Sequence, residues 1–188
     1  MAAATSLLGY AILGLLHQQP RSGYDLRKIF ANTPMGTFSD SPGAIYPALQ
    51  RLEKQGLVRG QLQPSSGRRR RRVFRPTAYG RRSFKAWQTK SISADDLIHR
   101  LDELMLRFGF MDEAAGSAQA TRFLKSLTRE LRRYTPSLRQ YLKANARQMP
   151  LSGRLALESG VRSYEELLRW SRSCLTKYAR RKRGGRRT

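Results

Sequence analysis

Three helical patterns followed by a change to strand periodicity at Gly56 are the feature that most restricts how this chain can fold. Within residues 7–16, 26–30 and 45–52, apolar side chains recur three and four positions apart, which is typical of amphipathic helices. After Gly56, the segments LVRGQLQ and RRRRRVFRPT alternate partly between apolar and polar residues, and the turn cluster PSSG lies between them. This order predicts three helices and a β-hairpin, which is the arrangement of a winged helix.

Each expected helix has a start or stop signal of its own. Pro20 ends the first helix, because proline cannot continue the helical hydrogen bonds. Ser22 and Asp25 have capping-box spacing and open the second helix, and Ser41 is the expected N-cap of the third. Thr77 is the expected cap of a fourth helix, which leads out of the winged helix toward a boundary near residues 90–93.

The second half of the chain is expected to be purely helical. Apolar residues share one face of residues 97–108 and predict a helix there. Two longer runs, residues 123–141 and 157–178, repeat apolar or small residues in alternating steps of four and three, which is heptad spacing. Pro150 and Gly153 separate these runs, so we expect an antiparallel helical pair, kinked at Pro136. Its seam would also pack on other helices, from this chain or from a second one.

The charge of the chain predicts a polyanionic partner. There are 37 Lys and Arg residues against 13 Asp and Glu, giving a formal net charge of +24 at pH 7. No acidic residue occurs in residues 59–90, so the predicted wing lies in a basic block. The five consecutive arginines can straddle backbone phosphates or enter a narrow minor groove, although such a run alone is also typical of a solvated segment: Arg68, Arg69, Arg70, Arg71 and Arg72.

The third helix has an outward face suited to a DNA major groove. Ile45, Leu49 and Leu52 are expected to face the core. The opposite side then carries Gly43, Pro47, Gln50 and Lys54, flanked by Tyr46 and Arg51. Gln can bond the edge of adenine, and Arg or Lys can bond the acceptors of guanine. The small residues Gly43 and Ala44 let the helix N-terminus approach a phosphate, with Ser41 as a positioning contact. An ordinary solvated face on a three-helix core is the alternative.

Enzymatic and metal-binding functions are not supported by the sequence. The chain has one cysteine, Cys174, and two histidines, His17 and His99, so a disulfide framework and an all-protein metal site are both disfavoured. Neither histidine has an acid or a nucleophile spaced to partner it. We therefore expect no catalytic residues, no metal and no cofactor, in a reducing and cytosolic setting.

Two further expectations concern membranes and small molecules. No segment approaches the roughly 20 uncharged apolar residues that a membrane span requires, so we expect a soluble, cytoplasmic and nucleoid-associated protein. Trp87, Phe108 and Trp170 could line a flat pocket for a planar ligand, although core packing is the alternative for all three.

Several segments resemble one known family. LLGYAILGLL, SGYDLRKIF and SPGAIYPALQRLEKQGLV, in this order, are similar to the DNA-binding domain of PadR-type transcriptional regulators, and the resemblance covers roughly residues 5–87. The pattern Pro-Gly-x-Ile-Tyr-Pro-x-Leu at residues 42–49 is its most diagnostic part. The segments LDELMLRFGFMD and ESGVRSYEELLRW are similar to the larger subclass of the family, which has a longer helical C-terminal part.

The resemblance implies a homodimer that binds double-stranded DNA at an inverted repeat, usually represses a nearby gene and is often released by a small molecule. It adds Tyr24 to the expected DNA-facing residues and supports Ser41, Gly43, Ala44, Tyr46 and Pro47, whereas Gln50 comes from the helical pattern alone. The wing departs from the family in one respect, because Val73, Phe74 and Pro76 stand where paired aromatic residues are usual.

We therefore expect a mainly α protein, with an N-terminal winged helix-turn-helix that carries a two-stranded wing and a C-terminal all-α dimerisation domain. The expected boundaries are residues 1–90 for the DNA-binding domain, with the wing at about residues 57–77, residues 91–180 for dimerisation, and residues 181–188 for a disordered basic tail. The alternative function is a nonspecific nucleoid-type protein that binds DNA or RNA through charge alone.

Overall fold

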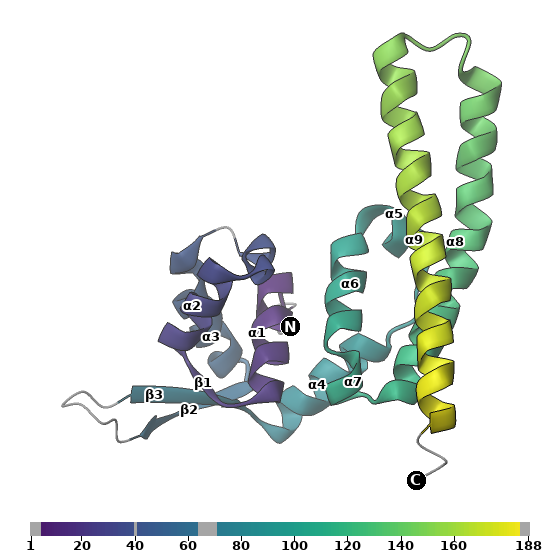
Figure 1. Ribbon diagram of the computed structural model, residues 1–188. Helices are drawn as coiled ribbons and strands as arrows, with labels where there is room; N and C mark the ends of the chain where they lie inside the picture. Colours follow the sequence, from purple (N-terminus) through teal and green to yellow (C-terminus); the bar gives the residue numbers. More distant parts are fainter. Residues whose placement is uncertain (1–4, 40, 64–70, 185–188) are drawn as a thin grey trace. The chain divides into compact units, whose positions relative to one another are not determined.

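The computed structural model describes residues 5–39, 41–63 and 71–184, and the chain forms two compact units (Figure 1). The first unit contains Met1–Thr89 together with Gly109–Ala115, and the second contains Lys90–Phe108 together with Gly116–Thr188. The fold is mainly α with one small sheet, which confirms the expected class.

The first unit holds a helix-turn-helix core, a hairpin and a connecting helix. Its elements in chain order are α1 (Leu7–Gln18), β1 (Arg21–Ser22), α2 (Gly23–Asn32), the 3₁₀ helices η1 (Pro34–Phe38) and η2 (Pro42–Ala44), α3 (Ile45–Lys54), β2 (Val58–Gln63), β3 (Arg71–Pro76), α4 (Ala78–Thr89) and α7 (Met111–Ala114).

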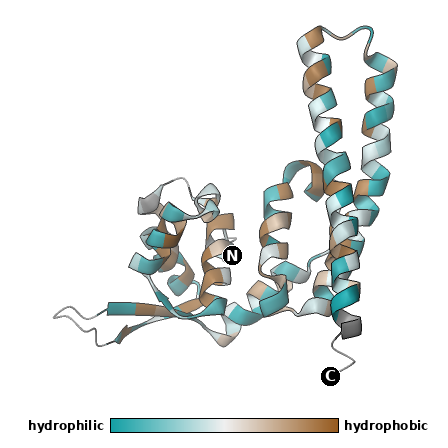
Figure 2. Ribbon diagram, viewed as in Figure 1, coloured by the Kyte–Doolittle hydropathy of each residue, from teal (hydrophilic) through white to brown (hydrophobic). Residues whose placement is uncertain are grey.

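The hydrophobic core of this unit lies among α1, α2 and α3. In Figure 2, α1 is predominantly hydrophobic, and its Ile12 is fully buried. Ile45, Leu49 and Leu52 of α3 are each 2% exposed or less, as their spacing predicts. Because these residues face inward, the opposite side of α3 is left for solvent or a partner.

The sheet has three strands, one more than the sequence predicts. β3 lies in the middle and pairs antiparallel with both β1 and β2. In the hairpin, the register runs from Val58 opposite Pro76 to Gln63 opposite Arg71. β1 is only two residues long, and a strand of that length is too short to show an alternating pattern.

The junction between α3 and the wing is fixed by close packing. Gly56 has φ 69°, the left-handed conformation that ends α3. The Thr77 hydroxyl donates to the Gly56 carbonyl oxygen at 2.6 Å and accepts from the Gly80 amide at 2.9 Å, which caps α4. A Cβ atom on Gly80 would lie 1.9 Å from the carbonyl oxygen of Leu57, so this position requires glycine.

The segment Gly109–Ala115 corrects the predicted boundary, because it returns to the first unit after α6. Phe110 is 6% exposed and Met111 is fully buried. The ring of Phe110 packs closely against α1, where a Cβ atom on Gly14 would lie 2.4 Å from it, and contacts Phe84 edge-on at 6.1 Å between centroids. The expected boundaries place this segment in the C-terminal domain, but its apolar side chains complete the N-terminal core.

The second unit is all-helical. It contains α5 (Ala94–His99), most of α6 (Leu101–Gly109), α8 (Ser117–Asn145) and α9 (Leu151–Gly184), and α8 and α9 form an antiparallel hairpin (Figure 1). Within it, the Thr128 hydroxyl donates to the Ser171 hydroxyl at 3.0 Å, and the rings of Tyr134 and Tyr164 meet at 4.9 Å.

Two predictions for this half differ from the structure. The single helix expected over residues 97–108 is two helices, because the chain leaves the helical conformation at Arg100, whose guanidinium bonds Asp95 and Asp96. The tail expected from residue 181 is helical as far as Gly184, since α9 continues to that residue. The remaining tail residues lie outside the described part of the chain.

Candidate nucleic-acid interface

The exposed side of α3 presents the residues that its helical pattern predicts. Tyr46, Pro47, Gln50, Arg51 and Lys54 are all exposed, and the Tyr46 side chain is 47% exposed. Gly43, in η2 just before α3, is exposed, and Ala44 is half-buried. This side of the helix is therefore free to contact a partner over its whole length.

The predicted capping role of Ser41 is not observed. Ser41 stands at the N-cap position of η2, but its side chain makes no capping hydrogen bond. Its carbonyl oxygen instead accepts from the Ser39 hydroxyl at 2.8 Å and from the Ala44 amide at 3.0 Å. The Ala44 amide is therefore already bonded, whereas the exposed Ser41 hydroxyl can donate to an anion.

A groove of about 260 Å³ lies among α2, α3 and β3. It brings together five of the residues predicted to bind DNA, which lie far apart in the sequence: Tyr24, Tyr46, Gln50, Arg71 and Arg72. Its other lining residues are Ser22, Gly23, Leu49, Glu53 and Phe74. The groove is therefore a concave, partly aromatic surface edged by cations.

Two tyrosines define one side of this groove. Tyr24, at the start of α2, is 53% exposed, and the Arg27 guanidinium lies 5.6 Å from the centre of its ring. A Cβ atom on Gly23 would lie 2.6 Å from the ring of Tyr46, so glycine allows α2 and Tyr46 to approach closely. Both phenolic hydroxyl groups can donate to phosphate oxygens.

Glu53 joins α3 to both wing strands. Its Oε1 atom accepts from the Gly60 amide of β2 at 2.9 Å, and both carboxylate oxygens accept from Nη2 of Arg72 in β3 at 2.9 Å. The Arg72 guanidinium also lies 5.3 Å from the centre of the Phe74 ring. The wing is thus held in a defined position relative to α3, and Arg72 is oriented by both the carboxylate and the aromatic ring.

Asp25 makes a second link between the helices and the wing. Its Oδ2 atom accepts from the Ser22 amide at 3.0 Å and the Ser22 hydroxyl at 2.9 Å, which completes the predicted capping box, and it also pairs with Arg71. Burial raises the pKa of this carboxyl, but the Ser22 hydrogen bonds and the Arg71 charge outweigh burial and lower the pKa below 3.8. Asp25 therefore stays ionised at neutral pH.

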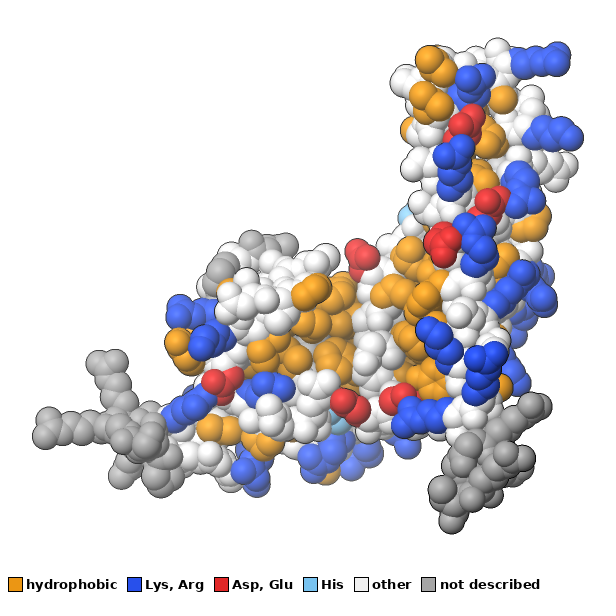
Figure 3. Space-filling view, in the orientation of Figure 1, with side chains coloured by type: hydrophobic (Ala, Val, Ile, Leu, Met, Phe, Trp, Pro, Cys, Tyr) orange, Lys and Arg blue, Asp and Glu red, His pale blue; other side chains and the backbone are white. Residues whose placement is uncertain are grey.

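The wing arginines divide into three groups. Arg68, Arg69 and Arg70 lie outside the described residues, whereas Arg71 is anchored by the carboxylate of Asp25 and Arg72 by that of Glu53. The sequence predicts phosphate contacts for the whole five-arginine run, and no signal in it indicates that two of its members pair with helix residues. In Figure 3, acidic side chains lie among the Lys and Arg side chains of this unit.

Arg59 and Arg75 are two further wing cations, which the sequence patterns did not single out. They are directly opposite each other on β2 and β3, and both are exposed. Like charges at opposed positions destabilise a hairpin unless an anion lies between them. The hairpin register is the signal that would have identified them.

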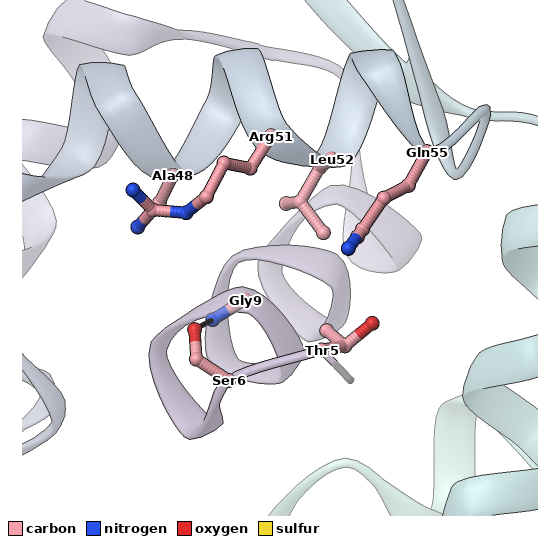
Figure 4. A pocket seen from close by; sticks show the side chains of 7 residues that line it. All are labelled: Thr5, Ser6, Gly9, Ala48, Arg51, Leu52 and Gln55. Carbon is pink, nitrogen blue, oxygen red and sulfur yellow. Dashed lines mark hydrogen bonds between the residues drawn. The ribbon is translucent and has the colours of Figure 1, made fainter. Parts of the chain in front are cut away.

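Arg51 lies on a different side of α3 from the groove. It lines a small pocket of about 70 Å³ with Ala48 and Leu52 of α3 and Gln55 just after it. Gly9 of α1 and the preceding residues Thr5 and Ser6 form the other side (Figure 4). Arg51 and Lys54 are thus exposed cations at the edge of the α3 surface rather than parts of the groove.

The three aromatic residues expected to bind a ligand belong to different units. Trp87 is 7% exposed in the first unit, where it stacks on Tyr10 at 4.1 Å between centroids. In the second unit, Phe108 and Trp170 meet edge-on at 5.4 Å. Core packing accounts for the position of Trp87, and the half-buried pair in the second unit remains a predicted ligand contact.

A metal site and a membrane-spanning helix each place requirements on the described residues. Among these residues, His, Cys, Asp and Glu form no group of three that could hold a metal ion. Within those same residues, no helix combines the length and the apolar character that crossing a membrane requires.

The three-helix core, the hairpin packed beside it and the exposed face of α3 define a winged helix-turn-helix DNA-binding protein. Residues 12–86 match the model of the Transcriptional regulator PadR-like family. The chain belongs to this family, as its motifs indicate. Its relatives are transcriptional regulators, which confirms that the protein is not an enzyme.

Characterised relatives support this assignment. The Negative transcriptional regulator PadR of Bacillus subtilis (strain 168) is 24% identical over 146 residues, which span 78% of this chain and 79% of the relative. Transcriptional regulator YqjI of Escherichia coli (strain K12) is 39% identical over 51 residues, which span 27% of this chain and 25% of the relative.

Among solved structures, Bacillus subtilis PadR in complex with operator DNA is similar to this chain. The TM-score is 0.43 at 23% identity, over 91% of this chain and 98% of that chain. Bacillus subtilis PadR in complex with p-coumaric acid gives a TM-score of 0.41 at 20% identity, over 92% of this chain and 99% of that chain.

Proposed function

We propose that this regulator is a repressor that binds an inverted-repeat operator as a homodimer and is released by a small molecule. The observation that carries the proposal is the α2–α3–β3 groove, which joins Gln50 of α3 to two exposed tyrosines and the anchored arginines of the wing. A surface with polar, aromatic and cationic groups beside an exposed helix suits a DNA groove and its backbone.

The DNA contacts follow from the chemistry of these groups. Gln50 reads a base edge in the major groove, since its amide both donates and accepts. The hydroxyl groups of Tyr24, Tyr46 and Ser41 contact phosphates and position the DNA backbone, with the small Gly43 and Ala44 allowing close approach. Arg71 and Arg72, together with Arg59 and Arg75, supply wing contacts to flanking phosphates.

We propose that the protein dimerises through its second unit, because α9 carries apolar side chains that the described residues of this chain cover only in part. In α9, the heptad residues Leu157, Tyr164, Leu168 and Leu175 are half-buried, and only part of their surface is covered by the residues described. Leu151 and Leu155 at the start of α9 are 62% and 51% exposed. A second copy would cover these residues and place two winged helices one DNA turn apart, roughly 34 Å.

The proposals that this protein represses transcription and is released by a small molecule are based on its relatives. The Bacillus subtilis relative is described as a negative regulator and has been solved with operator DNA and with p-coumaric acid. In this chain, Phe108 and Trp170 are the proposed contacts for a planar effector, because they offer aromatic edges in a half-buried position.

The proposal is tested by retaining sheared genomic DNA on the purified protein at about 0.15 M salt, where nonspecific contacts are partly screened. Sharp peaks that share an inverted repeat are expected. Uniform retention would instead favour the second candidate function, a nonspecific nucleoid-type DNA- or RNA-binding protein, for which the net charge of +24 is the supporting observation.

Gln50→Ala tests base reading by α3. Removing the amide is expected to cost about 1–3 kcal/mol at one operator position and to leave affinity for random DNA nearly unchanged. Competition titrations with operator variants measure both quantities. Equal losses on operator and random DNA would contradict the assigned role of Gln50.

A further inference from the structure

The structure points to a second DNA-binding surface, which we propose lies on the outer face of α8, outside the winged helix. α8 contains seven Lys and Arg residues and a single acidic residue, Glu130. This excess of positive charge lies in the second unit and is separate from the arginine run of the wing. The seven cations are Arg122, Lys125, Arg129, Arg132, Arg133, Arg139 and Lys143.

The cations lie on one side of the helix. At about 100° per residue, all seven fall within an arc of about 120°. The buried residues Phe123, Leu124, Leu127 and Leu131 lie on the opposite side, in the core of the unit. From Arg122 to Lys143, the cationic face extends over about 32 Å at 1.5 Å per residue, close to one turn of DNA.

Most of this charge has no compensating acid. Glu130 is only 11% exposed and pairs with Arg129 at 3.0 Å, and Arg139 pairs with Glu165 of α9. Lys125, Arg132, Arg133 and Lys143 make no ion pair within the described residues. In Figure 3, Lys and Arg side chains follow the side of the hairpin on which α8 lies.

A helix that serves only as a solvated surface has a different charge pattern. In α9, Arg154 and Arg169 pair with acids three or four positions away, which stabilises a helix. In α8, by contrast, like charges stand at such spacing, as in Arg122 with Lys125 and Lys125 with Arg129, which destabilises it. An anionic partner along this face would remove the repulsion.

DNA fits this surface better than a membrane does. A helix that binds a membrane surface buries its apolar face among the lipids. The main apolar side chains of α8 are already buried within the unit and are not free to do this. What remains is a row of cations, which can track backbone phosphates without reading bases. We therefore assign this face to duplex DNA, independently of whether α3 recognises an operator.

The test uses the full chain with Lys125→Gln, Arg132→Gln and Arg133→Gln combined. Binding to a random duplex is measured by fluorescence anisotropy across a salt series. The plot of log K against log salt has a negative slope, and each lost phosphate contact makes it shallower by about 0.9. Loss of three contacts is therefore expected to reduce the magnitude of the slope by about two to three. Affinity at about 0.1 M salt is expected to fall more than tenfold.

The matched control removes the same charge from α9 through Arg162→Gln, Lys177→Gln and Arg180→Gln, all at exposed positions. Circular dichroism and light scattering establish that both variants keep their fold and oligomeric state. Equal slopes in the two variants would show an effect of total charge and overturn the proposal. Loss of binding to anionic vesicles with unchanged DNA affinity would also overturn it and assign the face to a membrane.

Discussion

Glu53→Gln would show how the wing is held against α3, because this substitution removes the charge and keeps one acceptor. The amide oxygen of the substituted side chain can still accept from the Gly60 amide, which lies 2.9 Å from Oε1 of Glu53. Its amide nitrogen cannot accept from Arg72, so one of the two hydrogen bonds to Nη2 and the charge attraction to β3 are lost. The substitution therefore isolates the ion pair between α3 and the wing.

The magnitude follows from exposure. The Arg72 and Glu53 side chains are 53% and 29% exposed, and an ion pair in this range contributes about 0.2–1 kcal/mol. The Gly60 hydrogen bond contributes about 1 kcal/mol. We expect Glu53→Gln to lower the free energy of unfolding of the first unit by about 0.5 kcal/mol, and Glu53→Ala by about 1.5 kcal/mol. Denaturant titration measures both.

The effect on DNA binding is expected to be larger than the effect on stability. Without the Glu53 carboxylate, the positive charge that Arg72 presents to a phosphate is no longer offset, so affinity for random DNA is expected to be kept or raised and the salt slope to steepen by about one. The wing is then no longer fixed relative to α3, and operator affinity is expected to fall about tenfold relative to random DNA, or about 1.4 kcal/mol. Anisotropy titrations on both duplexes give this ratio.

Glu113→Gln is the matched control, because it makes the same chemical change at an exposed position of α7 in the same unit. Equal changes in the operator-to-random ratio for the two variants would refute the positioning role of Glu53. If Glu53→Gln lowered stability and left that ratio unchanged, Glu53 would support the fold without contributing to recognition.

The remaining predictions concern stability. Phe110→Ala is expected to lower the free energy of unfolding by about 3–5 kcal/mol, since its ring is 6% exposed. The exposed Tyr141→Ala serves as a control with a change of about 0.5 kcal/mol or less. Because the pKa of Asp25 is lowered, its stabilising contribution is present above pH 3.8 and is lost as the pH falls below that value. Asp25→Asn should therefore cost about 1 kcal/mol at about pH 6 and flatten the loss of stability at acid pH in thermal melts; an unchanged acid profile would contradict the assignment.

Local signals in the sequence predicted the winged helix well. The spacing of Ser22 and Asp25 is a capping box, and the structure confirms it with both reciprocal hydrogen bonds. The inward face of α3 follows from helical periodicity, because burial of Ile45, Leu49 and Leu52 needs only the repeat of the helix. Features that depend on neighbours within one or two turns are therefore accessible from the residues alone.

Features that depend on distant pairing were missed. Arg72 lies 19 positions from Glu53, and no periodicity relates the two residues. The two residues of β1 are recognisable as a strand only beside β3. Phe110 and Met111 were assigned to the second half because the helical pattern on both sides is continuous, whereas their burial depends on the core that they complete.

The return of Gly109–Ala115 to the first unit means that the polypeptide passes between the two units three times, near residues 90, 109 and 116. The N-terminal unit is therefore not a contiguous module. A protease that cuts within residues 90–108 would leave a nicked protein whose N-terminal fragment is still packed against Phe110. An exchange of DNA-binding units between relatives would need to transfer both segments, because a junction at residue 90 alone would leave the recipient core without the side chains that fill it.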